Sequence, residues 1–321
     1  MTVKIALLGI VGAAVVLSAA NREGSAKTTT KITTRPQLFL PEFLSAGGRI
    51  TLTPGFSPDG STMYFAQTEC TPIWECPQRL KRMVRAGNGW SKPERVPLPQ
   101  DARVDYPSVT PDGRYLLFSW AAVRPEHPGA KLNDNFDLWR LDLADPAAVP
   151  VLLRGPDLNR IREGAVRTLR FVHNETAPIQ TNKGDLYFWS ERLDGMGDRD
   201  VYRARPDGQG GFQRPELLPA PINSPKGDDG AWISPDSQTM LITYQDRGGC
   251  GGSDLFIAYR TRDSWTKPVN LGCTINSPYD EYAATIVPGT RTLVFPSTRP
   301  FKGATKGAVA LWSAQLPAIT L

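Results

Sequence analysis

The clearest structural signal in the sequence is a tight turn followed by an apolar run: Phe56-Ser57-Pro58-Asp59-Gly60-Ser61-Thr62-Met63-Tyr64-Phe65. Proline presets φ at the first turn position, aspartate caps the turn with its side chain, and glycine takes the position that needs a positive φ. The apolar residues that follow are typical of an inner strand of a sheet. The stretch therefore predicts two strands joined by a tight turn.

The same pattern returns four more times in degenerate forms. The turns begin at Pro58, Pro111, Asn182, Pro235 and Pro288, which are 53, 71, 53 and 53 residues apart. Only the first two copies keep the full Pro-Asp-Gly; the third reads Asn-Lys-Gly, the fourth Pro-Asp-Ser and the fifth Pro-Gly-Thr. Three equal spacings indicate an internal repeat.

Two further signals recur inside each repeat. An Asp–aliphatic–aromatic step predicts a third strand, as in Asp137-Leu138-Trp139, Asp200-Val201-Tyr202 and Asp254-Leu255-Phe256. An aromatic residue and then a proline precede a short apolar run, as in Trp265-Thr266-Lys267-Pro268, and predict an outer fourth strand where proline is tolerated. Four strands in about 50 residues are typical of a β-propeller blade.

This counting predicts an all-β fold with five four-stranded blades in one domain, residues 37–321. The long spacing between Pro111 and Asn182 is interpreted as an insertion, and the alternative is a sixth blade in 160–172. The last repeat stops after its third strand, near 311–316. Residues 37–44 resemble an unpaired fourth strand, so we expect this N-terminal strand to complete the last blade and close the ring.

A family resemblance rests on two phrases, Asn276-Ser277-Pro278-Tyr279-Asp280-Glu281-Tyr282-Ala283 and the glycine-rich run from Arg247 to Phe256. Both resemble the WD40-like Pro-Asp repeats of exported, TolB-like propellers, over roughly residues 37–316. The resemblance implies the propeller fold. It implies little about activity, because that family includes scaffolds, binding proteins and domains attached to enzymes.

The N-terminus has the layout of a secretory signal peptide, residues 1–20. One lysine precedes an uncharged stretch from Ile5 to Ala20, which is shorter than the roughly 20 residues of a membrane span and ends in small residues. The alternative is an uncleaved anchor. A flexible linker is predicted for 21–36. The mature protein would be periplasmic or secreted, without a membrane span, and its net charge would fall from +5 to +4 with the loss of Lys4.

Charge and cysteine patterns narrow the class further. No block of five like charges occurs, which argues against nucleic-acid binding. Four cysteines in an exported chain permit disulfides, and their spacing favours Cys70–Cys76 and Cys250–Cys273. A metal site is the alternative, although no Cys-x-x-Cys occurs and the histidines are only His127 and His173.

Five acidic residues lie six or seven positions before the turns, where the innermost strand of each blade should line a central channel: Asp105, Glu175, Asp228, Asp229 and Glu281. Three interpretations remain open. The acids would accept backbone N–H bonds between blades, or form a ring that holds a cation or polar ligand, or include a pair that acts in hydrolysis.

Other chemistry has weaker signals. The loops 194–200 and 133–137 have oxygens at a spacing that Ca²⁺ would use, although neither matches an EF-hand, and no other cofactor is predicted. Trp74, Trp120, Trp189 and Trp232 would stack on sugar or peptide if exposed and pack between blades if buried. A serine-hydrolase elbow, a phosphate loop and a His-Glu-x-x-His motif are all missing from the sequence.

The sequence therefore favours an exported, non-catalytic propeller that binds a protein or glycan partner of the cell envelope at its channel face. The alternative is a glycoside hydrolase or lyase that acts on a polysaccharide through channel carboxylates.

Overall fold

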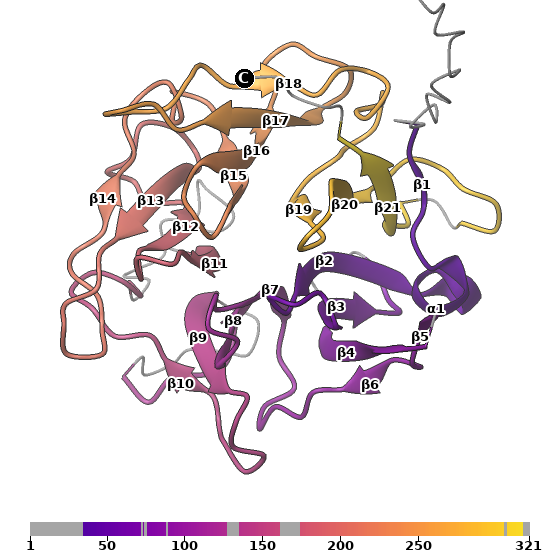
Figure 1. Ribbon diagram of the computed structural model, residues 1–321, viewed down its shortest axis with the longest axis horizontal. Helices are drawn as coiled ribbons and strands as arrows, with labels where there is room; N and C mark the ends of the chain where they lie inside the picture. The colour runs from indigo at the N-terminus through magenta and orange to yellow at the C-terminus, as the bar shows by residue number, and fades with distance from the viewer. Residues whose placement is uncertain are drawn as a thin grey trace, which may run out of the picture. The chain divides into compact units, whose positions relative to one another are not determined.

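The computed structural model describes residues 35–71, 73, 76–87, 89–126, 135–160, 174–304 and 307–316. These residues form a five-bladed β-propeller within one compact unit, Thr33–Leu321 (Figure 1). The predicted fold class and the count of five blades are confirmed. The predicted signal peptide, most of the linker, Trp74, both histidines, part of the 133–137 loop and most of the candidate sixth blade lie outside the described residues.

Each blade is an antiparallel sheet whose first strand is innermost. Blade 1 has β2 (Ile50–Phe56), β3 (Thr62–Thr68) and β4 (Arg79–Ala86), and two short strands, β5 (Gly89–Trp90) and β6 (Glu94–Arg95), both pair with β4. Blade 2 has β7 (Val104–Val109), β8 (Tyr115–Trp120), β9 (Asp137–Asp142) and β10 (Val151–Leu152). Blade 3 has β11 (Glu175–Gln180), β12 (Leu186–Ser190), β13 (Asp200–Ala204) and β14 (Glu216–Leu217).

Blade 4 has β15 (Asp228–Ile233), β16 (Thr239–Gln245), β17 (Ser253–Tyr259) and β18 (Val269–Asn270). Blade 5 has β19 (Thr285–Ile286), β20 (Thr292–Ser297) and β21 (Ala310–Gln315), and β1 (Gln37–Leu38) pairs with β21 as its fourth strand. The Asp–aliphatic–aromatic steps begin third strands, as predicted, and the outer fourth strands are only two residues long.

The ring closure by an N-terminal strand is confirmed, but the predicted strand over residues 37–44 is wrong in length. Leu40 takes a left-handed conformation, φ 47°, and Pro41 begins the short helix α1 (Pro41–Leu44), followed by the 3₁₀ helix η1 (Ala46–Gly48). Proline suits the first turn of a helix because its missing N–H is not needed there. None of the helices in the described part of the chain is long and apolar enough to cross a membrane.

The core lies between neighbouring blades rather than inside any one of them. For example, Tyr187 and Val201 of blade 3 share a buried cluster with Ile242 and Phe256 of blade 4. A similar cluster joins each of the other four neighbouring pairs, including blades 5 and 1 across the closure. Each blade therefore depends on both neighbours to bury its apolar faces.

The innermost strands share one irregularity that positions the channel side chains. The pairing register shifts at the same place in β2, β7, β11 and β15, which marks a β-bulge in each. Tyr106, Ala177 and Gly230 have positive φ at the bulges of β7, β11 and β15, and Ala283 has it at the equivalent place before β19. A bulge re-aims the side chains on its two sides.

Both predicted disulfide pairings are present. Cys70–Cys76 closes the loop that follows β3, and Cys250–Cys273 joins the β16–β17 loop to the segment after β18. The structure contains no free cysteine among its described residues.

Candidate functional site

Three of the predicted channel acids lie seven positions before their turns and are fully buried. Glu175, Asp228 and Glu281 each form an ion pair with an arginine that follows the second strand of the same blade. The arginines are Arg192, with Nη2 at 3.0 Å from Glu175 Oε1, Arg299, with Nη2 at 2.9 Å from Glu281 Oε1, and Arg247, which contacts Asp228.

Hydrogen bonds take up the remaining oxygen atoms of these acids. The Ser277 backbone N–H donates to Glu281 Oε2 at 2.7 Å, and the hydroxyls of Ser277 and Ser297 donate to Oε1, each at 2.6 Å. Ser224 donates to Asp228 in the same way, from its backbone and its hydroxyl. Burial raises the pKa of Glu175 well above its usual range, although the nearby charge of Arg192 lowers it. Burial likewise raises the pKa of Asp228 to about 6, although Arg247 lowers it.

These three acids line neither of the two cavities described below. Blade 2 also has an arginine after its second strand, although it lacks an acid at the position of Glu175, Asp228 and Glu281. Val104 occupies the equivalent strand position there, and Arg124 instead forms an ion pair with Asp137, with Nε 2.8 Å from Oδ2. Burial raises the pKa of Asp137 to about 7, while Arg124 acts in the opposite direction.

The other two predicted acids lie one position later, six residues before their turns. Asp105 is buried, with Thr53 Oγ1 and the Tyr106 N–H donating to its Oδ1, and burial raises its pKa to about 6. The shift of one residue turns Asp105 toward a cavity. Asp229 pairs with Thr243 in the β15–β16 ladder, but its side chain lies outside the described part of the structure.

A cavity of about 670 Å³ collects side chains from all five blades, and we call it the polar mouth. Its five charged residues are Arg103, Asp105, Glu191, Arg199 and Asp280. Four aromatic rings also line it, those of Tyr106, Phe136, Trp189 and Tyr282. A concave site with a few convergent polar groups and aromatic walls is the usual form of a small-ligand site.

Blade 3 contributes the densest group to the polar mouth. Thr176 and Trp189 are cross-strand partners in β11 and β12, and Asn174 and Glu191 lie two residues from them along the chain. Asn174 Nδ2 donates to Glu191 Oε2 at 3.0 Å, and Arg199 Nε donates to Glu191 Oε1 at 2.9 Å. Alternate residues of a strand share a face, so Glu175, between Asn174 and Thr176, points the other way, toward Arg192.

Ring contacts order the aromatic part of the polar mouth. The Arg199 guanidinium lies 5.2 Å from the centroid of the Trp189 ring, and Tyr106 meets Trp189 edge-on at 6.0 Å. Arg103 lies 4.4 Å from the centroid of Phe136. Buried polar atoms of lining residues that make no hydrogen bond in the described structure include Gln78 Oε1, Thr176 Oγ1 and Trp189 Nε1.

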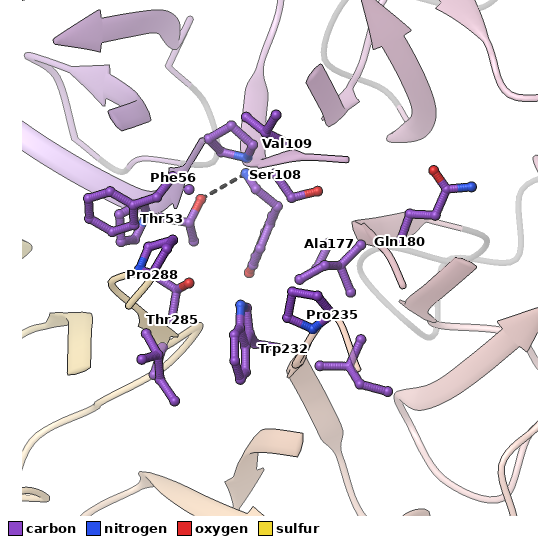
Figure 2. A pocket seen from close by; sticks show the side chains of 18 of the residues that line it. Thr53, Phe56, Ser108, Val109, Ala177, Gln180, Trp232, Pro235, Thr285 and Pro288 are labelled. Atoms are coloured by element: carbon purple, nitrogen blue, oxygen red, sulfur yellow. Dashed lines mark hydrogen bonds between the residues drawn. The ribbon is translucent and has the colours of Figure 1, made fainter. Parts of the chain in front are cut away.

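A second cavity, about 400 Å³, occupies the channel toward the Pro-Asp turns, and we call it the uncharged channel. Its walls are the innermost strands after their bulges, and none of its lining residues is charged. Figure 2 shows Trp232 in the middle of this cavity, between Thr285 and Pro235. Tyr106 and Gly230 line both cavities, so the two cavities meet at the bulges.

The tryptophans named in the sequence separate into three places. Trp120 is core between blades 1 and 2, Trp189 lines the polar mouth, and Trp232 lines the uncharged channel. Sequence reasoning missed the partners of Trp189, namely Asn174, Thr176, Glu191 and Arg199. The alternation of polar residues on both sides of Glu175 is the signal that would have found the first two.

Two carboxylates of the candidate calcium loop 194–200, those of Asp194 and Asp200, accept hydrogen bonds from the protein itself. Asp194 accepts two bonds from Arg160, at 2.8 and 2.9 Å, and Asp200 Oδ2 accepts the backbone N–H groups of Met196 and Gly197. Across the described residues, no group of three or more His, Cys, Asp or Glu side chains has a metal-binding arrangement.

No protein-family profile and no curated protein matches this sequence. Solved structures do match it in shape. An α-L-arabinofuranosidase from Lactobacillus brevis aligns with a TM-score of 0.52 at 13% identity, over 85% of this chain and 93% of that one. TolB from Acinetobacter baumannii aligns with a TM-score of 0.47 at 16% identity, over 83% of this chain.

This chain covers 54% of the TolB chain and 34% of a prolyl endopeptidase that it also resembles in shape, at 19% identity and a TM-score of 0.38. At such low sequence identities, structural similarity supports the fold and not the function. The alignment with the arabinofuranosidase agrees with the β-propeller fold that the five sheets show.

Proposed function

We propose that the protein is a non-catalytic binding propeller whose polar mouth holds a hydroxyl-rich ligand of the carbohydrate class. The main support is a group of side chains from blade 3 that line one part of the cavity. They are the indole of Trp189, the carboxylate of Glu191, the guanidinium of Arg199, the amide of Asn174 and the hydroxyl of Thr176. Planar polar side chains bond well to neighbouring hydroxyls, and an aromatic ring packs against the apolar face of a sugar.

The unpaired polar atoms support a polar ligand in this place. A buried donor or acceptor without a partner costs about 1–3 kcal/mol, so a ligand hydroxyl that pairs with one of these atoms offsets that cost. Thr176 Oγ1 and Trp189 Nε1 belong to one cross-strand pair, and Gln78 Oε1 comes from blade 1. Trp189 Nε1 can donate to a ligand hydroxyl, Gln78 Oε1 can accept from one, and Thr176 Oγ1 can do either.

An extended peptide is the less favoured ligand. A peptide that adds a strand needs a continuous row of free N–H and C=O groups on an exposed strand edge. The inward edges of β2, β7, β11 and β15 are interrupted by bulges, which break such a row.

The proposed location is outside the cytoplasm, either periplasmic or secreted. Two disulfides support it, since disulfides persist in oxidising compartments and are rare in the cytosol. The predicted signal peptide supports it as well. A glycan of the cell envelope is the ligand that fits both the location and the chemistry of the polar mouth.

Asp105 favours a second candidate, a glycoside hydrolase or lyase. It is the one inner-strand acid with a described side chain that lines the polar mouth, and its pKa of about 6 keeps part of it protonated near neutral pH. A general acid needs such a pKa. Glu191 and Asp280 line the same cavity and would supply the second carboxylate.

The test is calorimetric titration of a glycan panel into the protein and two matched variants. Trp189→Phe removes an indole N–H from the polar mouth, and Trp265→Phe removes one from the core between blades 3 and 4. We expect a saturable glycan ligand whose affinity falls about fivefold or more, roughly 1 kcal/mol, in Trp189→Phe only. The proposal fails if no glycan binds, or if both variants bind like the wild type.

The same panel separates binding from catalysis. Incubation followed by an assay for new reducing ends or unsaturated ends should find no cleavage by the wild type. Cleavage that disappears in Asp105→Asn would replace the binding proposal with the hydrolase or lyase.

A further inference from the structure

The uncharged channel is a second cavity that carbohydrate binding at the polar mouth does not use. Its volume of about 400 Å³ lies within the usual range of small-ligand sites, about 300–1,000 Å³. The five blades contribute proline, glycine, small and apolar residues to it, together with Gln180 and Asn182. This wall differs from that of the polar mouth because none of its residues is charged.

The wall is poor in hydrogen-bond donors. Pro54, Pro107 and Pro178 occupy equivalent places at the bulges of blades 1, 2 and 3, and proline has no N–H. The Ser108 hydroxyl is already used, since it donates to the Pro178 carbonyl. A charged or strongly hydrated ligand would lose its water here without replacement, which costs several kcal/mol.

Aromatic and branched apolar side chains form the rest of the wall. Trp232 lies in the middle of the cavity (Figure 2). Phe56 and Ile179 also line it, and so does Tyr106, which it shares with the polar mouth. Aromatic rings contact other rings favourably in edge-to-face and offset-stacked arrangements. The occupant that this wall fits is therefore an uncharged, flat aromatic molecule of small size.

The cavity is preformed. Gly55 lies so close to the neighbouring blade that a Cβ on it would fall 2.0 Å from the Pro107 carbonyl oxygen, so the two innermost strands are packed backbone to backbone. The rim contains Pro58, Pro111, Pro235 and Pro288, whose rings fix φ. A preformed apolar pocket binds without the cost of ordering its walls.

We propose that the uncharged channel is a binding site for an uncharged aromatic small molecule, separate from the ligand of the polar mouth. Ligand entry is from the face of the Pro-Asp turns, where the four rim prolines lie. The two sites meet at Tyr106 and Gly230, but they select for opposite chemistry.

The test uses N-phenyl-1-naphthylamine, an uncharged aromatic probe whose fluorescence rises in apolar surroundings. Titration of the full chain should give saturable binding, with energy transfer from tryptophan. Two substitutions at one position supply the comparison. Thr285→Arg places a charge in the cavity and should weaken binding about tenfold or more, whereas Thr285→Val keeps the shape and should stay within about twofold.

Trp189→Phe, in the polar mouth, should also leave probe binding within about twofold, which separates this site from the proposed carbohydrate site. The proposal is overturned if the wild type shows no saturable binding, or if Thr285→Arg binds the probe as well as Thr285→Val does. Failure of glycan binding leaves this test unaffected.

Circular dichroism must show that Thr285→Arg is folded, because Thr285 is 6% exposed. If it does not fold, Gln180→Arg serves instead. Gln180 is half-buried and lies on the opposite wall of the cavity (Figure 2). Weaker binding of the probe in Gln180→Arg supports the proposal, and unchanged binding overturns it.

Discussion

The two cavities of the channel are lined in part by the same innermost strands, yet five charged side chains line the polar mouth and none lines the uncharged channel. The change occurs at the bulges, where Tyr106 and Gly230 belong to both cavities. Before the bulge, alternate residues point to the polar mouth or to a buried arginine; after it, the strand shows proline and apolar residues to the channel. A single extra residue per strand therefore divides one channel into two chemical environments.

Two kinds of carboxylate occur near the polar mouth. Glu281 is wholly buried against Arg299 and two serines, whereas Asp105 lines a cavity. The first kind holds a blade together, and the second kind is available to a ligand. The predictions below test this division, from the largest expected effect to the smallest.

Glu281→Ala should cost about 3–5 kcal/mol of unfolding free energy, because it leaves the Arg299 charge buried without its partner. Thr285→Ala, in the same blade but at the uncharged end, is the control and should cost about 1 kcal/mol or less. Urea unfolding measures both. A loss for Glu281→Ala no larger than that of the control would mean that the buried acids do not stabilise the blades.

Asp105→Asn should change how stability depends on pH. The folded-state pKa of Asp105, about 6, is above the unfolded value of 3.8, so ionising it costs stability as pH rises through this window. The free energy of unfolding of the variant, relative to that of the wild type, should therefore increase by on the order of 2 kcal/mol between pH 4 and pH 7. Urea unfolding at several pH values measures it.

Asp59→Asn is the control of opposite sign. Hydrogen bonds from Ser57 and Ser61 lower the pKa of Asp59 to about 2, so its charged form stabilises the turn above the unfolded pKa. This variant should lose stability relative to the wild type as pH rises through 2–4. A constant difference between Asp105→Asn and the wild type at every pH would contradict the assignment of Asp105.

Arg199→Met should cost about 1–2 kcal/mol, because Glu191 is largely buried and loses a charge-assisted bond. Arg82→Met breaks the exposed pair with Glu94 and should cost about 0–1 kcal/mol. Thermal unfolding compares the two variants. Equal losses would show that the Arg199–Glu191 pair behaves as an ordinary surface pair.

Thr285→Val should have the smallest effect, within about 0.5 kcal/mol, because the substitution changes a hydroxyl to a methyl in a cavity wall without charge. Thr176→Val makes the same change in the polar mouth. It should weaken glycan binding and leave the free energy of unfolding close to that of the wild type. If Thr176→Val leaves glycan affinity unchanged, the unpaired hydroxyl is not part of the site.

Local patterns explain why the fold was predictable. Pro58-Asp59-Gly60 and its four copies are turn signals that act within a few residues, and their spacing located every blade. The closing strand was also found, although Pro41 ended it earlier than predicted. The cysteine spacing gave both disulfides.

The site was less predictable because its geometry depends on one residue of register. Asp105 and Asp228 both precede a turn by a similar distance, yet one lines a cavity and the other meets Arg247. The two acids differ by one register position, so they lie on opposite faces of their strands. The bulges that follow them have no local sequence signature, since Tyr106, Ala177 and Ala283 all adopt positive φ without being glycine. Arg199 and Glu191 come together across a loop, which strand periodicity does not describe.

Because β1 pairs with β21, blade 5 must be completed late during synthesis. β1 (Gln37–Leu38) is synthesised long before β21 (Ala310–Gln315), so blade 5 cannot be completed until residues 310–315 have left the ribosome. At about 5–20 residues per second, β1 waits roughly 15–60 s for its partner. A strand of two residues exposes few backbone groups during that wait, which limits pairing with the wrong neighbour. The shortness of the closing strand is thus suited to a ring that closes only after all five blades have been synthesised.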